Sequence, residues 1–521
     1  MRVGIRVDAS LEMGTGHLRR CMTLAAALID KGADVRFVVR RHDAVSAVAL
    51  GSQPFSVVWL DPPVPGSGSA SPRSEDSSYQ HWSGAGWAED ASDTVEALRG
   101  LEPDWVIVDH YALDARWHDQ VRQGLGCRLM AIDDLADRPL AVDVLLDANL
   151  AEDHGRKYQG RLERKTRILG GPRFAILSQA YRSATPYPFH PQVRSIGVFM
   201  GGTDPGGVSA RVLKACREDA GFDGLIEVVS TSANPRLEAL GAACAADPDA
   251  RLLLDLPDLS AFYARHDLQI GGGGTASYER CRMGAPSIAL VLAPNQLAVI
   301  PMLAANGTVR PARLSDDPGT DTPGSAPDLV DVIRELVADP DARLKLSERG
   351  RALVDGRGAD RVTFCLLASS MTLRRATLED GAQLHAWRNH PDIRAISGTS
   401  EPIALASHMD WLAGKLAAED CRLYVGEIGG SAIGSIRFDR MQEGALQVSL
   451  YLDPDLPGLG LGPHLLLAGE RDVMADWLGD ATFTASVMLD NAVSARLFVS
   501  CGYSGAPPRY TKHVAQRKSV S

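Results

Sequence analysis

The chain has 521 residues, of which 45% are hydrophobic and 23% charged, and its formal net charge is -11. This length exceeds one ordinary core and predicts about three domains. The acidic balance argues against non-specific binding of nucleic acid, and no stretch approaches the run of about 18 apolar residues that a membrane-spanning helix needs.

The eight cysteines are scattered, without a CxxC pair or the spacing of a metal site. Cys21, Cys127 and Cys216 are expected to be small buried residues, which fits a reducing compartment. The opening sequence MRVGIRVDAS lacks the apolar core of a signal peptide. We therefore expect a cytoplasmic enzyme, without a nucleic-acid or membrane partner.

Strands and helices alternate in the first part of the chain. Strands are predicted at residues 1–7, 35–39, 105–109, 129–133 and 144–147, with a helix over about residues 17–31. This rhythm is typical of a doubly wound parallel sheet. Residues 61–93 interrupt it, because they are rich in Pro, Gly, Ser and acidic residues, and they are interpreted as a long surface loop.

A second α/β unit is predicted from about residue 195 to residue 366. Its strands are expected at residues 195–200, 226–230, 251–254, 268–270 and 287–292, and a loop rich in Pro, Asp and Gly is expected at residues 316–327. Two Rossmann-like units in series, with the ligand cleft between them, describe a GT-B architecture.

A third unit is predicted to start near residue 371 with a strand, a turn and a helix. Residues 423–428, 431–438 and 446–452 then read as consecutive antiparallel strands, before a Gly-rich turn and another helix. The predicted fold is an α/β pair of Rossmann-type domains, residues 1–190 and 191–366, followed by an α+β domain at residues 371–521.

Two features of the first strand and helix indicate a ligand site. Asp8 ends the first strand, and Gly14, Gly16 and His17 open the helix that follows. Ligands of open parallel sheets bind beyond the carboxyl ends of strands, and glycines at a helix start let the backbone approach an anion. His17 is predicted to point into the cleft as a neutral base, the alternative being a packing or capping role.

Polar side chains follow two further strands. The apolar run WVIV is followed by Asp109, His110 and Tyr111. The apolar run LMAI is followed by Asp133 and Asp134. Polar residues at several carboxyl strand ends predict one functional rim. Capping of the next helix is the alternative for one of these aspartates.

The second unit carries two glycine-rich strand ends. The first has Gly201, Gly202, Thr203 and Asp204, and the second has Gly273 and Gly274 followed by Thr275, Ser277 and Glu279. Backbone amides of such a loop can cradle a diphosphate, and a carboxylate one turn into the helix can accept ribose hydroxyls. Asn295 and Gln296 complete this pattern.

These motifs resemble the UDP-sugar hydrolases of pseudaminic acid biosynthesis, a family related in fold to the GT-B UDP-GlcNAc transferase of peptidoglycan assembly. The matching segments are RVDASLEMGTGHLRRC, IVDHYALD, AIDDLADR, LLDANL, GPRFAILSQAYR, FMGGTDP and GGGGTASYERCRMGAPS. They occur in family order over most of residues 1–310. The main departure is the insertion after residue 60, which is expected to lie away from the motifs.

The resemblance implies hydrolysis of UDP-2,4-diacetamido-2,4,6-trideoxy-β-L-altropyranose, with water attacking the anomeric carbon and UDP leaving, without a metal. His17 matches the catalytic His as base or water positioner, and Asp109, His110 and Tyr111 match the Asp-His-Tyr motif, with Tyr111 near the sugar. The substrate-binding residues are then expected to be Asp8, Gly14, Gly16, His110, Asp133, Asn149, Gly201, Gly202, Thr203, Asp204, Gly273, Gly274, Thr275, Ser277, Glu279, Asn295 and Gln296.

The third unit has its own ligand motif. Gly458, Gly460 and Gly462 alternate after a strand, so that several backbone N–H groups can converge on a pyrophosphate. Residues 448–452 just before them can pair with the amide-rich pantetheine arm of a coenzyme through free backbone groups. A plain glycine-rich connector is the alternative.

The later segment DNAVSARLFVSCGY resembles the Asn-x-x-Ser and Gly-Phe/Tyr tail of the GNAT acetyltransferases, on Asn491, Ser494, Gly502 and Tyr503. This implies acetyl-CoA as co-substrate, bound by Leu450, Leu452, Gly458, Gly460, Leu461, Gly462 and Asn491. Many GNAT enzymes use a Tyr to protonate the leaving thiolate, but Phe498 stands there. That role stays open among Tyr503, a water and another group.

The start of the third unit resembles the sugar-amine GNAT of the same pathway, on Trp387, Arg388, Asn389, His408 and Trp411. The two halves then fit consecutive steps, acetylation of UDP-4-amino-4,6-dideoxy-N-acetyl-β-L-altrosamine and hydrolysis of its product. Three alternatives remain: a UDP-sugar glycosyltransferase, the same two steps on a related stereoisomer, and a half that only binds the nucleotide sugar.

Overall fold

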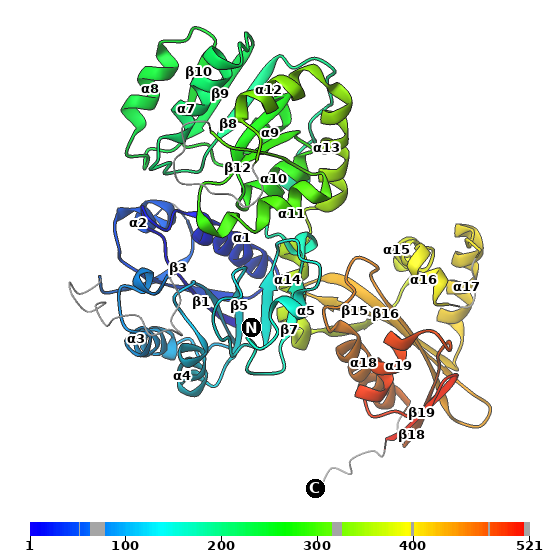
Figure 1. Cartoon of the computed structure of the whole chain (residues 1–521). Coiled ribbons are helices and arrows are strands. Elements are labelled where there is room, and N and C mark those ends of the chain that lie inside the picture. Colours follow the sequence, from blue (N-terminus) through cyan, green and yellow to red (C-terminus); the bar gives the residue numbers. More distant parts are fainter. Residues whose placement is uncertain (52, 63–78, 315–325, 398–400, 478–479, 515–521) are drawn as a thin grey trace. The chain divides into compact units, whose positions relative to one another are not determined.

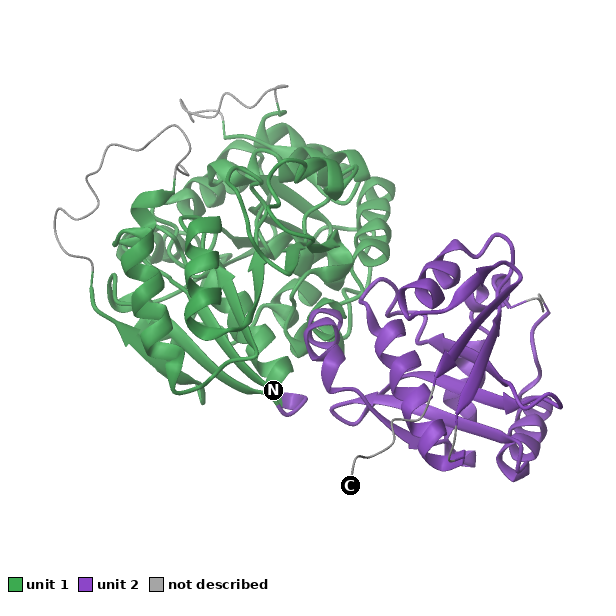
Figure 2. Cartoon of the chain, turned by 90° about the horizontal axis from the view of Figure 1, so that it is seen from below, with its two compact units in different colours: residues 1–29, 33–360 green, residues 30–32, 361–521 purple. Residues whose placement is uncertain are grey.

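The computed structural model describes residues 1–51, 53–62, 79–314, 326–397, 401–477 and 480–514. The chain divides into two compact units, residues 1–29 with 33–360 and residues 361–521 with 30–32 (Figure 2). Among the described residues, no helix is both long and apolar enough to cross a membrane.

The first unit begins with a seven-stranded, all-parallel sheet in the order β3-β2-β1-β4-β5-β6-β7 (Figure 1). Its strands are β1 (Arg2–Val7), β2 (Asp34–Arg40), β3 (Ser56–Leu60), β4 (Trp105–Asp109), β5 (Arg128–Ile132), β6 (Val144–Asp147) and β7 (Arg167–Gly170). The helices are α1 (Gly16–Asp30), α2 (Ala44–Leu50), α3 (Trp87–Arg99), α4 (Ala115–Leu125), α5 (His154–Lys157) and α6 (Gln179–Ser183). β1 lies inside the sheet and is buried after Arg2, which explains its apolar sequence.

A six-stranded parallel sheet follows in the same unit, in the order β10-β9-β8-β11-β12-β13. It consists of β8 (Ser195–Phe199), β9 (Leu225–Ser230), β10 (Ala250–Leu254), β11 (Leu268–Gly272), β12 (Ser287–Leu290) and β13 (Arg310–Ala312). Its helices are α7 (Val208–Lys214), α8 (Leu237–Ala245), α9 (Ser260–Arg265), α10 (Ala276–Met283), α11 (Val299–Asn306), α12 (Leu329–Ala338) and α13 (Pro340–Leu353). α14 (Gly358–Leu367) contains residue 360, at which the first unit ends. Two Rossmann-type sheets in series confirm the predicted α/β class.

The second unit contains a mixed seven-stranded sheet in the order β14-β15-β16-β17-β18-β20-β19. Its strands are β14 (Thr372–Arg375), β15 (Cys421–Ile428), β16 (Ser431–Arg440), β17 (Leu446–Leu452), β18 (Ala481–Ser486), β19 (Ser504–Ala506) and β20 (Arg509–Val514). Its helices are α15 (Gly381–Arg388), α16 (Pro391–Ala395), α17 (Leu405–Ala417), α18 (Leu461–Trp477) and α19 (Ala492–Ser500). β15, β16 and β17 are antiparallel neighbours, as the sequence predicts, and β14 also pairs antiparallel with β15.

The strands β17 and β18 separate along their length. They pair in parallel only where Leu446–Val448 faces Phe483–Ala485, whereas β17 stays paired with β16 up to Leu452. Within the described chain, residues 449–452 therefore have no strand partner on the side of β18. This opening is the feature around which the second unit's cavity forms.

The predicted loop over residues 61–93 is wrong in its second part. Residues 63–78 lie outside the described part of the chain, as do residues 316–325 of the other predicted loop. Residues Gln80–Ser83 form a short 3-10 helix, and α3 begins at Trp87. Ala91, Val95 and Leu98 recur at helical spacing and are buried in the core, so packing outweighs the polar composition of this segment.

Candidate active sites

A cavity of about 440 Å³, here called the cleft cavity, is lined by residues of both parallel sheets of the first unit. From the first sheet it takes the start of α1 and the residues that follow β4, β5 and β6. From the second it takes the loop after β11 and the segment after β12. A cavity shared by two Rossmann-type halves is the predicted GT-B-like arrangement.

His17, at the start of α1, is held by a buried carboxylate. Its Nδ1 lies 2.6 Å from Oδ1 of Asp109. Arg20, one helical turn further on, donates from Nε to Oδ2 of Asp109 at 2.5 Å and from Nη2 to Oδ1 at 2.6 Å. Burial by itself raises the pKa of Asp109, but the Arg20 and His17 contacts outweigh it and hold that pKa well below its usual range.

An ionised Asp109 fixes the tautomer of His17. The carboxylate only accepts hydrogen bonds, so Nδ1 of His17 donates, and in the neutral ring the lone pair then lies on Nε2. His17 lines the cleft cavity, and its side chain is 14% exposed. The ring is therefore prepared to take a proton at Nε2 from a water molecule in the cavity.

Tyr111 belongs to a second hydrogen-bonded group on the rim. It donates to Oδ1 of Asp134 at 2.6 Å, and Nδ2 of Asn149 donates to the other oxygen of Asp134 at 3.1 Å. Two residues from helices that follow strands of the second sheet join this group: Tyr278 of α10 donates to Oδ1 of Asn149 at 2.8 Å, and Nδ2 of Asn295 donates to the Tyr111 hydroxyl at 3.4 Å. Burial raises the pKa of Tyr111 well above its usual value, so the hydroxyl stays neutral.

The glycine loop after β11 forms the opposite wall of the cleft cavity. Gln296 holds the loop, because its Oε1 accepts from the backbone N–H of Gly273 and of Leu292, each at 3.0 Å. A Cβ added at Gly273 would collide with Ile300, so only glycine fits there. Gly274 and Thr275 follow along the wall, directly before α10.

The cleft cavity brings together part of the predicted set. The predicted residues that line it are Gly16, His17, Tyr111, Asp133, Asn149, Gly273, Gly274, Thr275, Asn295 and Gln296. Asp109 acts on it through His17. The structure places Asp8, Gly14, His110, Gly201, Gly202, Thr203, Asp204, Ser277 and Glu279 outside the cavity lining.

The displaced residues have partners that explain their positions. Asp8 is fully buried and accepts from both Nη atoms of Arg6 at 2.5 and 2.8 Å, and Nε2 of His110 lies 3.3 Å from it. Asp204 accepts from the backbone N–H of Val208 and of Ser209, each at 2.9 Å, at the start of α7. These side chains organise the strand ends from within.

Sequence reasoning missed further residues of the cavity lining, among them Arg20, Tyr79, Trp82 and Tyr278. Arg20 could have been found, since it lies three residues after His17 on the same helix face. Tyr79 and Trp82 come from the end of the insertion that was expected to lie away from the motifs, and the structure corrects this expectation by placing both in the cavity lining. The residues around Tyr79 and Trp82 are polar, so no local pattern indicated that these two rings line a cavity.

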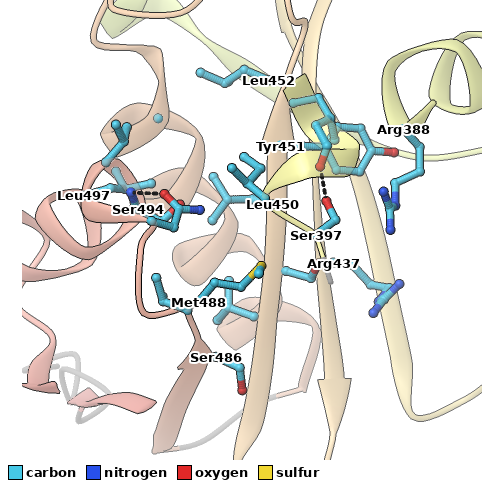
Figure 3. Close-up of a pocket in the computed structure, with 18 of the residues that line it drawn as sticks. Arg388, Ser397, Arg437, Leu450, Tyr451, Leu452, Ser486, Met488, Ser494 and Leu497 are labelled. Carbon is cyan, nitrogen blue, oxygen red and sulfur yellow. Dashed lines mark hydrogen bonds between the residues drawn. The ribbon is translucent and has the colours of Figure 1, made fainter. Parts of the chain in front are cut away.

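The second unit has a cavity of about 1100 Å³, here called the splay cavity, where β17 and β18 separate. Figure 3 shows Ser494 and Leu497 of α19 on one side of residues Leu450–Leu452, and Arg388 and Arg437 on the other. Of the residues predicted to bind a coenzyme, Leu450, Leu452, Gly458, Gly462 and Asn491 line it, whereas Gly460 and Leu461 do not. Leu461 is fully buried in the core.

Backbone groups dominate the coenzyme side of the splay cavity. The unpaired edge of residues 449–452 offers N–H and C=O groups of the kind that an extended amide chain can pair with. Gly458 has φ +82°, a left-handed conformation that favours glycine. Asn491 caps α19, as its Oδ1 accepts from the N–H of Ser494 at 3.0 Å.

Residues 370–504 match the acetyltransferase (GNAT) domain family. The chain is also 27% identical over 369 residues to the spore coat polysaccharide biosynthesis protein SpsG of Bacillus subtilis, covering 70% of this chain and 98% of that protein. It is 21% identical over 313 residues to the UDP-2,4-diacetamido-2,4,6-trideoxy-beta-L-altropyranose hydrolase of Campylobacter jejuni, covering 59% of this chain and 97% of that protein.

Among solved structures, MurG of Acinetobacter baumannii is similar with a TM-score of 0.46 and 13% identity, over 70% of this chain and 99% of that chain. The family match and the two relatives show an enzyme in which a GNAT acetyltransferase domain follows an N-terminal region that resembles SpsG and the Campylobacter hydrolase. This supports the predicted fusion.

The splay cavity of the acetyltransferase domain is also lined by His408. His408 is only 4% exposed, and its Nε2 has no hydrogen-bond partner among the described residues. The rings of His385 and Trp411 lie 5.4 and 5.3 Å away. Burial, together with the nearby His385 and Arg388, lowers the pKa of His408, so the imidazole is neutral near pH 7.

The acetyltransferase domain offers no tyrosine at the position where the family's proton donor is usual. Phe498 lines the splay cavity. Tyr503 is 3% exposed and lies outside the cavity lining, with its ring 5.0 Å from that of Phe498. This placement leaves Tyr503 in the packing around Phe498 and does not assign the donor.

Proposed function

We propose that the chain carries out two consecutive steps on a nucleotide sugar. The acetyltransferase domain acetylates the amine of UDP-4-amino-4,6-dideoxy-N-acetyl-β-L-altrosamine with acetyl-CoA, and the N-terminal region hydrolyses the resulting UDP-2,4-diacetamido-2,4,6-trideoxy-β-L-altropyranose. Residues 1–190 and 191–366 would form the two halves of the hydrolase, and residues 371–521 the acetyltransferase. The observation that carries the hydrolase is His17 bound to Asp109 and facing the glycine loop.

Hydrolysis follows from this arrangement. Nε2 of His17 takes a proton from water, the water oxygen bonds to the anomeric carbon, and the bond from that carbon to the UDP oxygen breaks. The diphosphate would lie against Gly273, Gly274 and Thr275, where backbone amides and the start of α10 stabilise the charge that develops on it. The Tyr111 hydroxyl, held by Asp134, would position the sugar.

Acetylation uses the splay cavity. The pantetheine arm pairs with the open edge of β17, the amine attacks the thioester carbonyl, and the C–S bond breaks to release the coenzyme. Arg388 and Arg437 line the opposite end, where cations suit the diphosphate of the nucleotide sugar. All eight cysteines are free and buried, which supports a cytoplasmic setting for both steps.

The test is to incubate the full chain with the UDP-4-amino sugar, with and without acetyl-CoA, and to follow UDP and sugar masses. Release of UDP that requires acetyl-CoA, with one acetyl group gained, is the expected result. UDP release without acetyl-CoA would contradict the coupled order. Acetylation without UDP release would favour a glycosyltransferase, and added acceptor sugars would then restore UDP release. A glycosyltransferase is the second candidate because the name of SpsG refers to polysaccharide biosynthesis.

A further inference from the structure

One wall of the cleft cavity is aromatic. Trp82 stacks on Tyr111 with ring centroids 5.8 Å apart and planes 27° apart, and it lies edge-on to His17 at 6.3 Å. The Tyr79 ring lies 4.6 Å from that of Trp82 and 5.2 Å from that of Tyr111. These four rings all line the cavity, so the base His17 is bordered by one continuous aromatic surface.

The segment that carries Tyr79 and Trp82 is anchored to the first unit. Ser83 Oγ donates to the carbonyl groups of Gln80 and Ala85 at 3.0 and 2.6 Å, which closes the 3-10 helix. Nε2 of His81 lies 2.9 Å from Oε1 of Glu12, in the loop that leads to α1. The position of the two rings is therefore fixed by local contacts as well as by the rings they touch.

The place of this wall decides which part of a nucleotide sugar meets it. The glycine loop provides the amides for the diphosphate, and the anomeric carbon must lie within reach of His17. The rings of Trp82 and Tyr79 surround that position, so they face the sugar ring. An aromatic face favours C–H groups, whereas a hydroxyl pressed against it loses its water without gaining a hydrogen-bond partner.

We propose that Tyr79 and Trp82 determine sugar specificity, by contacting the apolar face of a deoxy, N-acylated hexose. The missing hydroxyl and the methyl groups of such a sugar give the apolar area that these rings can cover. This inference rests on the proposed function insofar as the cleft cavity holds a nucleotide sugar. It assigns to the inserted segment a role in choosing among sugars.

The test measures dissociation constants by calorimetry in a His17→Ala background, so that sugars are not consumed. The ligands are UDP, UDP-N-acetylglucosamine and the UDP-2,4-diacetamido-trideoxy sugar. We expect Trp82→Ala to lower the preference for the deoxy sugar about tenfold, with UDP affinity changed less than about twofold. Trp82→Phe should keep most of the preference. Trp87→Ala is the matched control, since Trp87 is also half-buried, lies beside Arg116 and does not line the cavity.

A preference that is unchanged in Trp82→Ala and in Tyr79→Ala would overturn the inference, as would an equal loss for both sugars. The wild-type chain separates this from the proposed function. If it releases no UDP from the deoxy sugar while Trp82→Ala still shifts the binding preference, the specificity role stands and hydrolysis fails. If it releases UDP and the preference does not shift, hydrolysis stands and the specificity role fails.

Discussion

The cleft cavity and the splay cavity prepare their chemistry with different parts of the chain. In the cleft cavity, side chains hold one another: Arg20 and His17 share Asp109, and Tyr111 is fixed by Asp134. In the splay cavity, the coenzyme side is an open strand edge and a glycine loop. We therefore expect side-chain substitutions to abolish activity in the cleft cavity. In the splay cavity, substitutions that change the backbone conformation should reduce activity most.

The largest expected effect is on the base of the cleft cavity. His17→Ala removes the group that accepts the proton of water in the proposed hydrolysis. The rate of UDP release should therefore fall about 1000-fold. Acetylation by the same preparation should stay within about twofold, which provides the internal control. A fall in UDP release of less than about tenfold would show that His17 is not the base.

A buried histidine of the first unit should make the free energy of unfolding fall as the pH falls. His118 is fully buried, and burial together with the cations Arg138 and Arg122 lowers its pKa from 6.5 to about 3. Between these values the unfolded chain binds a proton that the folded chain does not, so stability falls as the pH falls. From pH 7.5 to pH 5.0 this group should remove about 2 kcal/mol.

His118→Gln should therefore lose less stability than the wild type between these two pH values, as measured by urea unfolding of the first unit. His390→Gln changes a partly exposed residue of the second unit and serves as the control. An equal loss of stability in wild type and His118→Gln would show that His118 does not cause the pH dependence.

The backbone character of the splay cavity can be tested with two glycines. Gly458 has φ +82° and Gly444 has φ +81°, and a Cβ added at either meets open space. Alanine at each should introduce a similar strain, of the order of 1 kcal/mol. Only Gly458 lines the cavity, so Gly458→Ala should raise the KM for acetyl-CoA about tenfold, while Gly444→Ala should not. Equal values of KM in both variants would refute the backbone role.

The smallest expected effect concerns the proton donor of the acetyltransferase domain, because Phe498 stands where a tyrosine is usual in the family. Phe498→Tyr places a hydroxyl at the cavity wall, where it can protonate the leaving thiolate. We expect kcat of acetylation to rise about threefold, with UDP release unchanged. A fall in kcat would instead show that the packing of the Phe498 ring, 5.0 Å from that of Tyr503, matters more than a donor.

The sequence predicted the strands that are long and apolar, such as β1 and β4, because a buried parallel strand reads as a continuous apolar run. It gave no prediction for β7 and β13, which have four and three residues. The helix α3 was not predicted because its sequence contains many polar residues. One of them, Asp90, is buried because it accepts hydrogen bonds from Arg6, a partner that the local pattern does not reveal.

The sequence by itself determined which chemical groups exist and where along the chain they stand: His17 at a helix start, glycines after strands, and Phe498 in place of a tyrosine. These follow from local periodicity and from the conformations that glycine permits. Only the tertiary structure decided that Asp8 and His110 turn inward, that Trp82 meets Tyr111, and that β17 parts from β18. Those outcomes depend on contacts between segments far apart in the chain, which no local pattern encodes.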